Sequence, residues 1–210
     1  MTRGFLFAVA CMATVVVVSN ILVQYLLGNW LTWGAFTYPF AFLVTDLSNR
    51  KYGVRAARKI VLAGFVVGVV CSFIGTQIIG EFGPLVTLRI AMGSGLAFIV
   101  AQLTDVAVFD RLRAKIWWLA PLASSVTGSA LDTFIFFTIS FSSFFIFIEP
   151  TNDVSWASEL LPVLGVGPTS SLWVSLAVAD FLVKIGLALI VLIPFRLIVQ
   201  KFMLGSFSQS

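Results

Sequence analysis

Long apolar runs joined by short polar connections set the pattern of this chain. Six of these runs predict membrane-spanning helices, at residues 5–27, 33–47, 60–79, 88–108, 117–139 and 171–193. A helix needs about 20 mainly apolar residues to cross the hydrocarbon core of a bilayer. The runs are too uniformly apolar for the alternating strands of a membrane barrel, so each crossing is expected to be helical. The pattern predicts an all-α membrane protein with a single domain over residues 1–210.

The composition supports a protein that lies within a bilayer. The chain is 60% hydrophobic and only 10% charged, and its mean hydropathy is +1.06. A soluble domain has about 25% charged residues, so a water-soluble fold would have too few polar residues to cover this much apolar surface.

The positions of the basic residues predict the orientation. They lie before the first run, in the second and fourth connections and after the last run, as Arg3, Arg50, Lys51, Arg55, Arg58, Lys59, Arg111, Arg113, Lys115, Arg196 and Lys201. The first, third and fifth connections have no Lys or Arg. Basic connections stay in the cytoplasm, so both termini are expected there, with residues 142–168 as an external loop. Since the basic clusters are short and border the spans, no nucleic-acid partner is expected.

Missing residue types argue against several chemistries. The chain has no His, and Cys11 and Cys71 lie inside apolar runs, so neither a zinc site nor another cofactor is expected. It has no GxxxxGK[ST] loop for nucleotide hydrolysis, and no HExxH motif or paired nucleophile and base that would indicate an enzyme. Energy for any transport must come from an ion gradient, a partner or removal of the solute inside the cell.

Charged residues inside the predicted spans are the first functional candidates. A charge in the bilayer centre costs roughly 2.5 to 3.5 kcal/mol or more, so it usually faces a cavity or a partner. Asp46, Arg89 and Asp105 are near span ends, where each is predicted to reach water by snorkelling. Asp180 and Lys184 are four residues apart, so they are predicted to form a structural ion pair on one helix face, with a proton relay as the alternative.

Asp132 lies deeper, in the half of its span that is rich in small polar residues. It is interpreted as an isolated carboxylate that lines a cavity; the alternative is a buried, hydrogen-bonded packing residue. Asn20 and Gln24 are one helical turn apart in the first span and are predicted to share a polar face.

The second span is short and has Pro39 near its middle. Pro removes a backbone donor and breaks a helix, and broken helices in transporters line binding sites. Phe36 and Tyr38 lie beside this break, where they are predicted to stack on a flat ligand.

Four blocks of sequence carry a resemblance to a known family. They are TWGAFTYPFAFLVTDLSNRKYG from Thr32, RIAMGSGLAFIVAQLTDVAVFDRLR from Arg89, WWLAPLASSVTGSALDTFIFFTISF from Trp117 and DFLVKIGLALIVLIPF from Asp180. Together they resemble the bacterial queuosine precursor transporters, which are grouped with energy-coupling-factor-like vitamin uptake transporters. The resemblance implies a six-helix inner-membrane protein that imports 7-cyano-7-deazaguanine or 7-aminomethyl-7-deazaguanine.

A deazaguanine has adjacent N–H donors on one edge and a flat aromatic face, which together suggest a binding site. The predicted contacts are Asp132, Asn20, Gln24 and Gln102 on the polar edge, and Phe36 and Tyr38 on the ring. Two modes of transport remain open, a self-sufficient carrier and a substrate-binding subunit that docks on an ATP-driven module. The sequence also leaves open whether the protein forms a homo-oligomer.

Overall fold

The computed structural model describes residues 2–81 and 83–204, with side chains as far as Lys201. Five long helices dominate it: α1 (Arg3–Leu22), α4 (Val54–Gln77), α5 (Leu88–Leu112), α6 (Leu119–Phe141) and α7 (Leu172–Ile198). Each of these is long and apolar enough to cross a membrane. The predicted all-α membrane class is confirmed. The six crossings and the cytoplasmic placement of the termini stay predictions.

The second predicted span is a broken element made of α2 (Gly34–Thr37) and α3 (Pro39–Tyr52). Pro39 is the first residue of α3 and has no N–H to donate, so the helical ladder is interrupted at Tyr38. On its own α3 measures about 21 Å, which is shorter than the hydrocarbon core. It packs on α1, α4, α5, α6 and α7, which places this short and rather polar helix inside the bundle.

Short hairpins and single helical turns form the connections. The hairpins pair β1 (Leu26–Leu27) with β2 (Leu31–Thr32), β3 (Ile79–Gly80) with β4 (Gly83–Pro84), and β5 (Leu160–Pro162) with β6 (Thr169–Ser171), all antiparallel. The turns are η1 (Ser143–Ile148), η2 (Ser155–Ser158) and η3 (Val163–Gly165), and η4 (Val199–Leu204) extends α7.

The first hairpin corrects the predicted end of the first span. Helix α1 ends at Leu22, and the chain then turns through Gly28, whose φ of 64° favours a glycine. Gln24 therefore lies beyond the helix, so the prediction that Asn20 and Gln24 are one helical turn apart was wrong.

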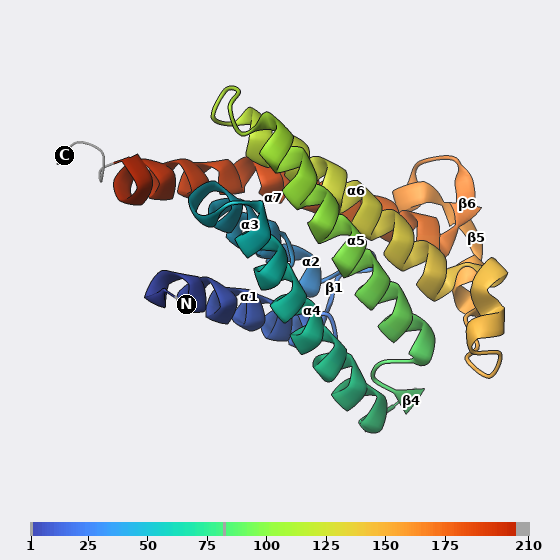
Figure 1. Cartoon of the computed structure of the whole chain (residues 1–210). Coiled ribbons are helices and arrows are strands. Elements are labelled where there is room, and N and C mark those ends of the chain that lie inside the picture. The colour runs from blue at the N-terminus through green and yellow to red at the C-terminus, as the bar shows by residue number, and fades with distance from the viewer. Residues whose placement is uncertain (1, 82, 205–210) are drawn as a thin grey trace.

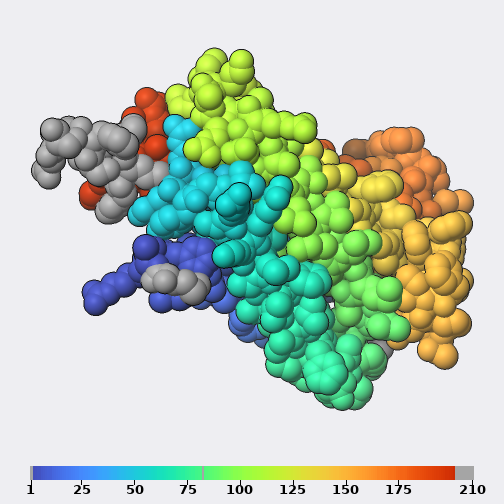
Figure 2. Space-filling view, in the orientation of Figure 1, coloured from blue at the N-terminus to red at the C-terminus, as the bar shows by residue number. Residues whose placement is uncertain are grey.

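The bundle has two chemically different ends. The start of α1, the Gly53 turn between α3 and α4, the α5–α6 connection and the end of α7 gather towards the left of Figure 1, and this is called the basic end. The β3–β4 hairpin and the 142–171 segment lie at the opposite end, called the acidic end. Figure 2 shows α4 and α5 side by side across one face, with the 142–171 segment at one end of that face.

The packing is that of a membrane protein, with large apolar side chains both inside and outside. One core cluster joins α1, α3, α4 and α5 around Met12, Ile60 and Phe98. On the outer surface Phe73 and Phe134 are 68% and 69% exposed, which suits contact with lipid acyl chains and not with water.

The expectation that Asp46, Asp105 and Arg89 snorkel to water was wrong, because they are 2%, 0% and 0% exposed. Arg89 donates hydrogen bonds from Nη2 to the carbonyl oxygens of Ile139 (3.0 Å) and Ser142 (2.7 Å), so the end of α6 holds its guanidinium, while Nη1 has no partner among the described residues.

We expect Asp153, which is exposed at the acidic end, to face the outside of the cell, and Lys115, exposed at the basic end, to face the cytoplasm. The measurement is labelling of single cysteines at these positions, in a chain whose two native cysteines are replaced, with a membrane-impermeant maleimide on intact cells. Asp153→Cys should react and Lys115→Cys should react only after lysis. The reverse pattern would contradict the orientation.

Candidate functional site

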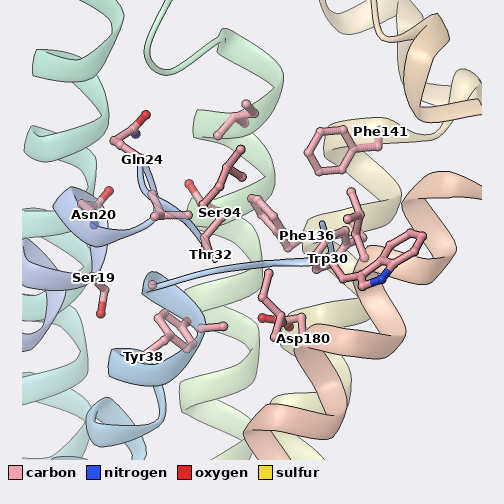
Figure 3. A pocket seen from close by; sticks show the side chains of 18 of the residues that line it. Ser19, Asn20, Gln24, Trp30, Thr32, Tyr38, Ser94, Phe136, Phe141 and Asp180 are labelled. Atoms are coloured by element: carbon pink, nitrogen blue, oxygen red, sulfur yellow. The ribbon is translucent and has the colours of Figure 1, made fainter. Parts of the chain in front are cut away.

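A cavity of about 370 Å³ lies between α1, the α2–α3 break, α6 and α7. Its rim includes Trp30 from the α1–α2 connection, Leu85 before α5, and Trp156 from the 142–171 segment. Its floor holds Asp132, Asp180 and Lys184. In Figure 3 Asn20 and Gln24 lie on one side of the cavity, and Phe136, Phe141 and Asp180 lie on the other.

The floor is a buried ionic network that joins α6 to α7. Nζ of Lys184 lies 2.6 Å from Oδ2 of Asp132 and 2.5 Å from Oδ2 of Asp180. Thr133 donates a hydrogen bond of 2.7 Å to the same oxygen of Asp180. The Lys184 and Asp132 side chains are only 5% and 9% exposed, so the three charges interact with little screening by water.

This network corrects two expectations. Asp132 is not an isolated carboxylate, since Lys184 pairs with it, and the ion pair predicted between Asp180 and Lys184 is part of a larger group. With both carboxylates ionised, two negative charges meet one positive charge, which leaves one net negative charge at the cavity floor. Both contacts to Lys184 use Oδ2 atoms, so the lysine does not contact the Oδ1 atom of either carboxylate.

Tyr38 closes one side of the floor. Lys184 Nζ lies 5.3 Å from the centroid of its ring, a cation–π distance, and its hydroxyl faces Asp132. The break at Pro39 accounts for this position. Helix α2 ends at Thr37 and α3 begins at Pro39, so Tyr38 lies between the two helices, where the chain forms part of the cavity wall.

The structure places four of the six predicted contact residues around the cavity, namely Asp132, Asn20, Gln24 and Tyr38. The amide of Asn20 donates one hydrogen bond to the Val16 carbonyl oxygen, at 2.9 Å. Phe36 and Gln102 do not line the cavity. Phe36 packs against Trp33, with ring centroids 5.9 Å apart, and Gln102 is fully buried and accepts a hydrogen bond of 2.6 Å from Thr45.

The aromatic wall was missed in the sequence. Phe136, Phe137 and Phe141 line the cavity from α6, and Trp30 and Trp156 line it from the connections. One signal was present, because Phe136 follows Asp132 by four residues and so lies on the same helix face. The contribution of Trp156 had no local signal, since it depends on how the 142–171 segment folds back over the bundle.

Towards the basic end the cavity is closed. Phe42, one turn after Tyr38 on α3, is 1% exposed and packs against Gly128 of α6. A Cβ atom at Gly128 would lie 2.6 Å from the Phe42 ring, so only glycine permits this contact. A path from the cavity to the basic end between α3 and α6 at this level therefore requires Phe42 to move.

Comparison with known proteins gives the family. Residues 32–199 match the family described as "Putative vitamin uptake transporter". The chain belongs to this family. The matched region runs from the α1–α2 connection to the end of α7, and so it contains most of the cavity and its ionic floor.

Curated relatives carry a more specific name. The "Probable queuosine precursor transporter" of Haemophilus influenzae is 36% identical over 175 residues, which cover 78% of this chain and 66% of that protein. The "Queuosine precursor transporter" of Escherichia coli is 34% identical over 194 residues, covering 86% of this chain and 79% of that protein. A third, "Probable queuosine precursor transporter" of Bacillus subtilis, is 29% identical over 195 residues, covering 84% and 74%.

The resemblance found in the sequence blocks is therefore confirmed. The chain spans just under two thirds of the length of the Haemophilus influenzae relative. No solved structure shows significant similarity to this chain. Membership of this vitamin uptake transporter family makes the chain a transporter and not an enzyme, and its apolar helices place it in the bacterial inner membrane as a multi-pass protein.

The ionic floor predicts an asymmetric response to neutralising mutations. Lys184→Met leaves two buried carboxylates without a cation, so folding should lose about 3 to 5 kcal/mol. Asp132→Asn and Asp180→Asn each leave one carboxylate paired with Lys184, so either variant should be close to the wild type in stability. The measurement is thermal unfolding of the purified proteins in detergent.

The control for this prediction is the triple variant Asp132→Asn, Asp180→Asn, Lys184→Met, which removes all three charges together. It should recover most of the stability that Lys184→Met loses, because the charges are coupled. Equal losses in Lys184→Met and Asp180→Asn would contradict the network.

Proposed function

We propose that this protein imports the deazaguanine bases from which queuosine is made, 7-cyano-7-deazaguanine or 7-aminomethyl-7-deazaguanine. The observation that carries the proposal is the cavity itself, which combines aromatic walls with a net negative floor in a chain whose relatives are named for queuosine precursors. Its volume of about 370 Å³ lies within the usual range of sites for small molecules.

The floor suits the donor edge of a deazaguanine. This edge presents a ring N–H beside an exocyclic amino group, and carboxylate oxygens are acceptors only. The Oδ1 atoms of Asp132 and Asp180 supply the acceptors, while Lys184 holds the Oδ2 atoms. A base in this pose occupies the part of the cavity where the charged side chains of the described lining lie.

The walls suit the rest of the base. Phe136 and Phe141 of α6 provide rings for stacking on its flat face. On the opposite side Asn20 and Gln24 present amides, each of which can donate to the carbonyl of the base or accept from its pyrrole N–H. Tyr38, which the sequence analysis assigns to the ring of the base, lies beside the floor, and we assign the stacking predicted for Phe36 to the α6 aromatics instead.

The position of the cavity suits uptake. Its rim is built from connections at the acidic end, and Phe42 closes it towards the basic end. With the basic end in the cytoplasm, this arrangement corresponds to a carrier that receives solute from outside. Transport then requires the cavity to close on the rim side of the bound base and to open on the other side, at Phe42.

The direct test is uptake of labelled 7-cyano-7-deazaguanine by liposomes that contain only this protein. We expect saturable uptake that unlabelled 7-aminomethyl-7-deazaguanine reduces and that adenine does not. Binding without uptake would favour the alternative, a substrate-binding subunit of an ATP-driven transporter. Neither binding nor uptake would contradict the proposed substrate.

The contact with Asp132 predicts a loss of affinity in Asp132→Asn. The amide replaces one acceptor oxygen by a donor that faces the N–H groups of the base, and a hydrogen bond to a charged group is worth roughly 1.5 to 3 kcal/mol. The dissociation constant for 7-cyano-7-deazaguanine, measured by calorimetry in detergent, should rise about 10- to 100-fold. Thr127→Ala, which removes an exposed hydroxyl from the same helix, should bind like the wild type, and unchanged binding by Asp132→Asn would remove this residue from the site.

The aromatic wall predicts a difference between two phenylalanines of similar, partial exposure. Phe136→Ala should weaken binding by roughly 1 to 3 kcal/mol, the range found for a base stacked on an aromatic ring. Phe36→Ala should leave the dissociation constant nearly unchanged, because that ring lies outside the cavity lining. Equal effects in the two variants would contradict stacking on α6.

A further inference from the structure

A second group of buried charges lies outside the cavity, closer to the basic end. The carboxyl groups of Asp46 on α3 and Asp105 on α5 face each other within hydrogen-bonding reach. Asp46 is 2% exposed and Asp105 is 0% exposed. Ser124 of α6 donates a hydrogen bond of 3.2 Å to Oδ1 of Asp46. Neither oxygen of Asp105 accepts a hydrogen bond from any described N–H or O–H group.

No cation offsets this pair within the described part of the chain. Besides Asp105, α5 contributes the neutral Gln102, whose Nε2 also has no partner. Helix α6 contributes the neutral Ser124, and α4 and α7 bring apolar groups to α3, including Ile60 and Phe195. Arg50, one turn further along α3, donates instead to the Arg113 carbonyl at the surface, at 2.6 Å.

Two ionised carboxylates in this setting would repel each other strongly with little screening. A single proton held between them removes one charge and supplies the missing donor, so that one carboxyl donates to the other. The unpartnered oxygens of Asp105 are where this proton is needed, and their complete burial keeps it from exchanging with water in this state.

The pair is connected to the cavity through α3. Tyr38, Phe42 and Asp46 follow one another at intervals of four residues and so lie along one face of the helix. Tyr38 borders the cavity floor, Phe42 is the seal, and Asp46 carries the carboxyl beyond it, about 12 Å along the axis from Tyr38. A movement of α3 that shifts Phe42 away from Gly128 must also separate Asp46 from Asp105 or Ser124.

We propose that Asp46 and Asp105 form a proton-binding site that couples substrate import to the entry of a proton. The protonated pair keeps α3 packed against α5 and α6 with the Phe42 seal closed. The pair takes up its proton from outside water through the cavity before Phe42 closes. When α3 moves, the carboxyl O–H bond breaks and the proton forms a new O–H bond with water on the cytoplasmic side. This coupling rests on the proposed import of deazaguanines, whereas the proton-binding site itself does not.

The first experiment detects the proton independently of transport. Infrared spectra of the purified protein should contain the carbonyl band of a protonated carboxyl at neutral pH. Asp46→Asn and Asp105→Asn should each lack this band. In either variant the amide supplies the hydrogen-bond donor in place of the protonated carboxyl, and the remaining carboxyl group ionises. Asp110→Asn is the matched control, since Asp110 is an exposed carboxylate on the same helix, paired with Arg113, and its loss should leave the band unchanged.

The second experiment measures coupling in liposomes that contain only this protein. In the wild type an external pH below the internal pH should raise the initial rate of 7-cyano-7-deazaguanine uptake several-fold, and a protonophore should abolish the increase. Asp46→Asn and Asp105→Asn should bind the base and exchange it across the membrane without responding to the gradient. Asp110→Asn should respond like the wild type.

The outcomes separate the two proposals. A wild-type protein without the protonated band has no shared proton, which overturns the site even if a variant fails to fold. A band accompanied by wild-type uptake that ignores the gradient, or by a full gradient response in both variants, overturns the coupling. Absence of any uptake or binding of the base in the wild type contradicts the proposed substrate and leaves the infrared result to decide on the proton.

Discussion

The site depends on a constraint that the bilayer imposes on charge. Lys184 is buried against Asp132 and Asp180, and removal of any member changes the balance for the other two because water cannot replace it. The network holds α7 to α6 at the depth where the cavity ends, and it places two carboxyl groups and one ammonium group in the cavity lining. A group that is expensive to bury thus serves both as a tie between helices and as the polar end of the binding cavity.

The broken element α2–α3 connects the cavity wall to the buried carboxyl pair. Because Pro39 interrupts the ladder, the chain can present Tyr38 to the cavity and then continue as a short helix surrounded by protein. That helix carries Phe42 and Asp46 on the same face as Tyr38. The cavity wall, Phe42 and the carboxyl pair are therefore linked through one segment, as the proposed coupling of solute and proton movement requires.

Much of the fold follows from local pattern. The long apolar runs predicted the five long helices, and most helix ends lie within a few residues of the predicted ones. Pro39 predicted the break. Both signals are local, because span length and proline geometry depend on neighbouring residues. The clearest errors concerned the end of one helix and the surroundings of three charged residues. The sequence pattern predicted that Gln24 lies on the first helix, which ends at Leu22. It also predicted that Asp46, Asp105 and Arg89 reach water, whereas each is buried.

The sequence by itself determined the membrane class, the charge asymmetry, the family resemblance and the intramembrane residues that had to be explained. Only the tertiary structure decided how those residues combine. Lys184 meets Asp132 across 52 residues of sequence, and Asp105 meets Asp46 through the packing of α5 on α3. The physical reason is that hydrophobic periodicity reports which face of a helix is apolar, whereas the partner of a buried polar group depends on the rotation and depth of the neighbouring helix.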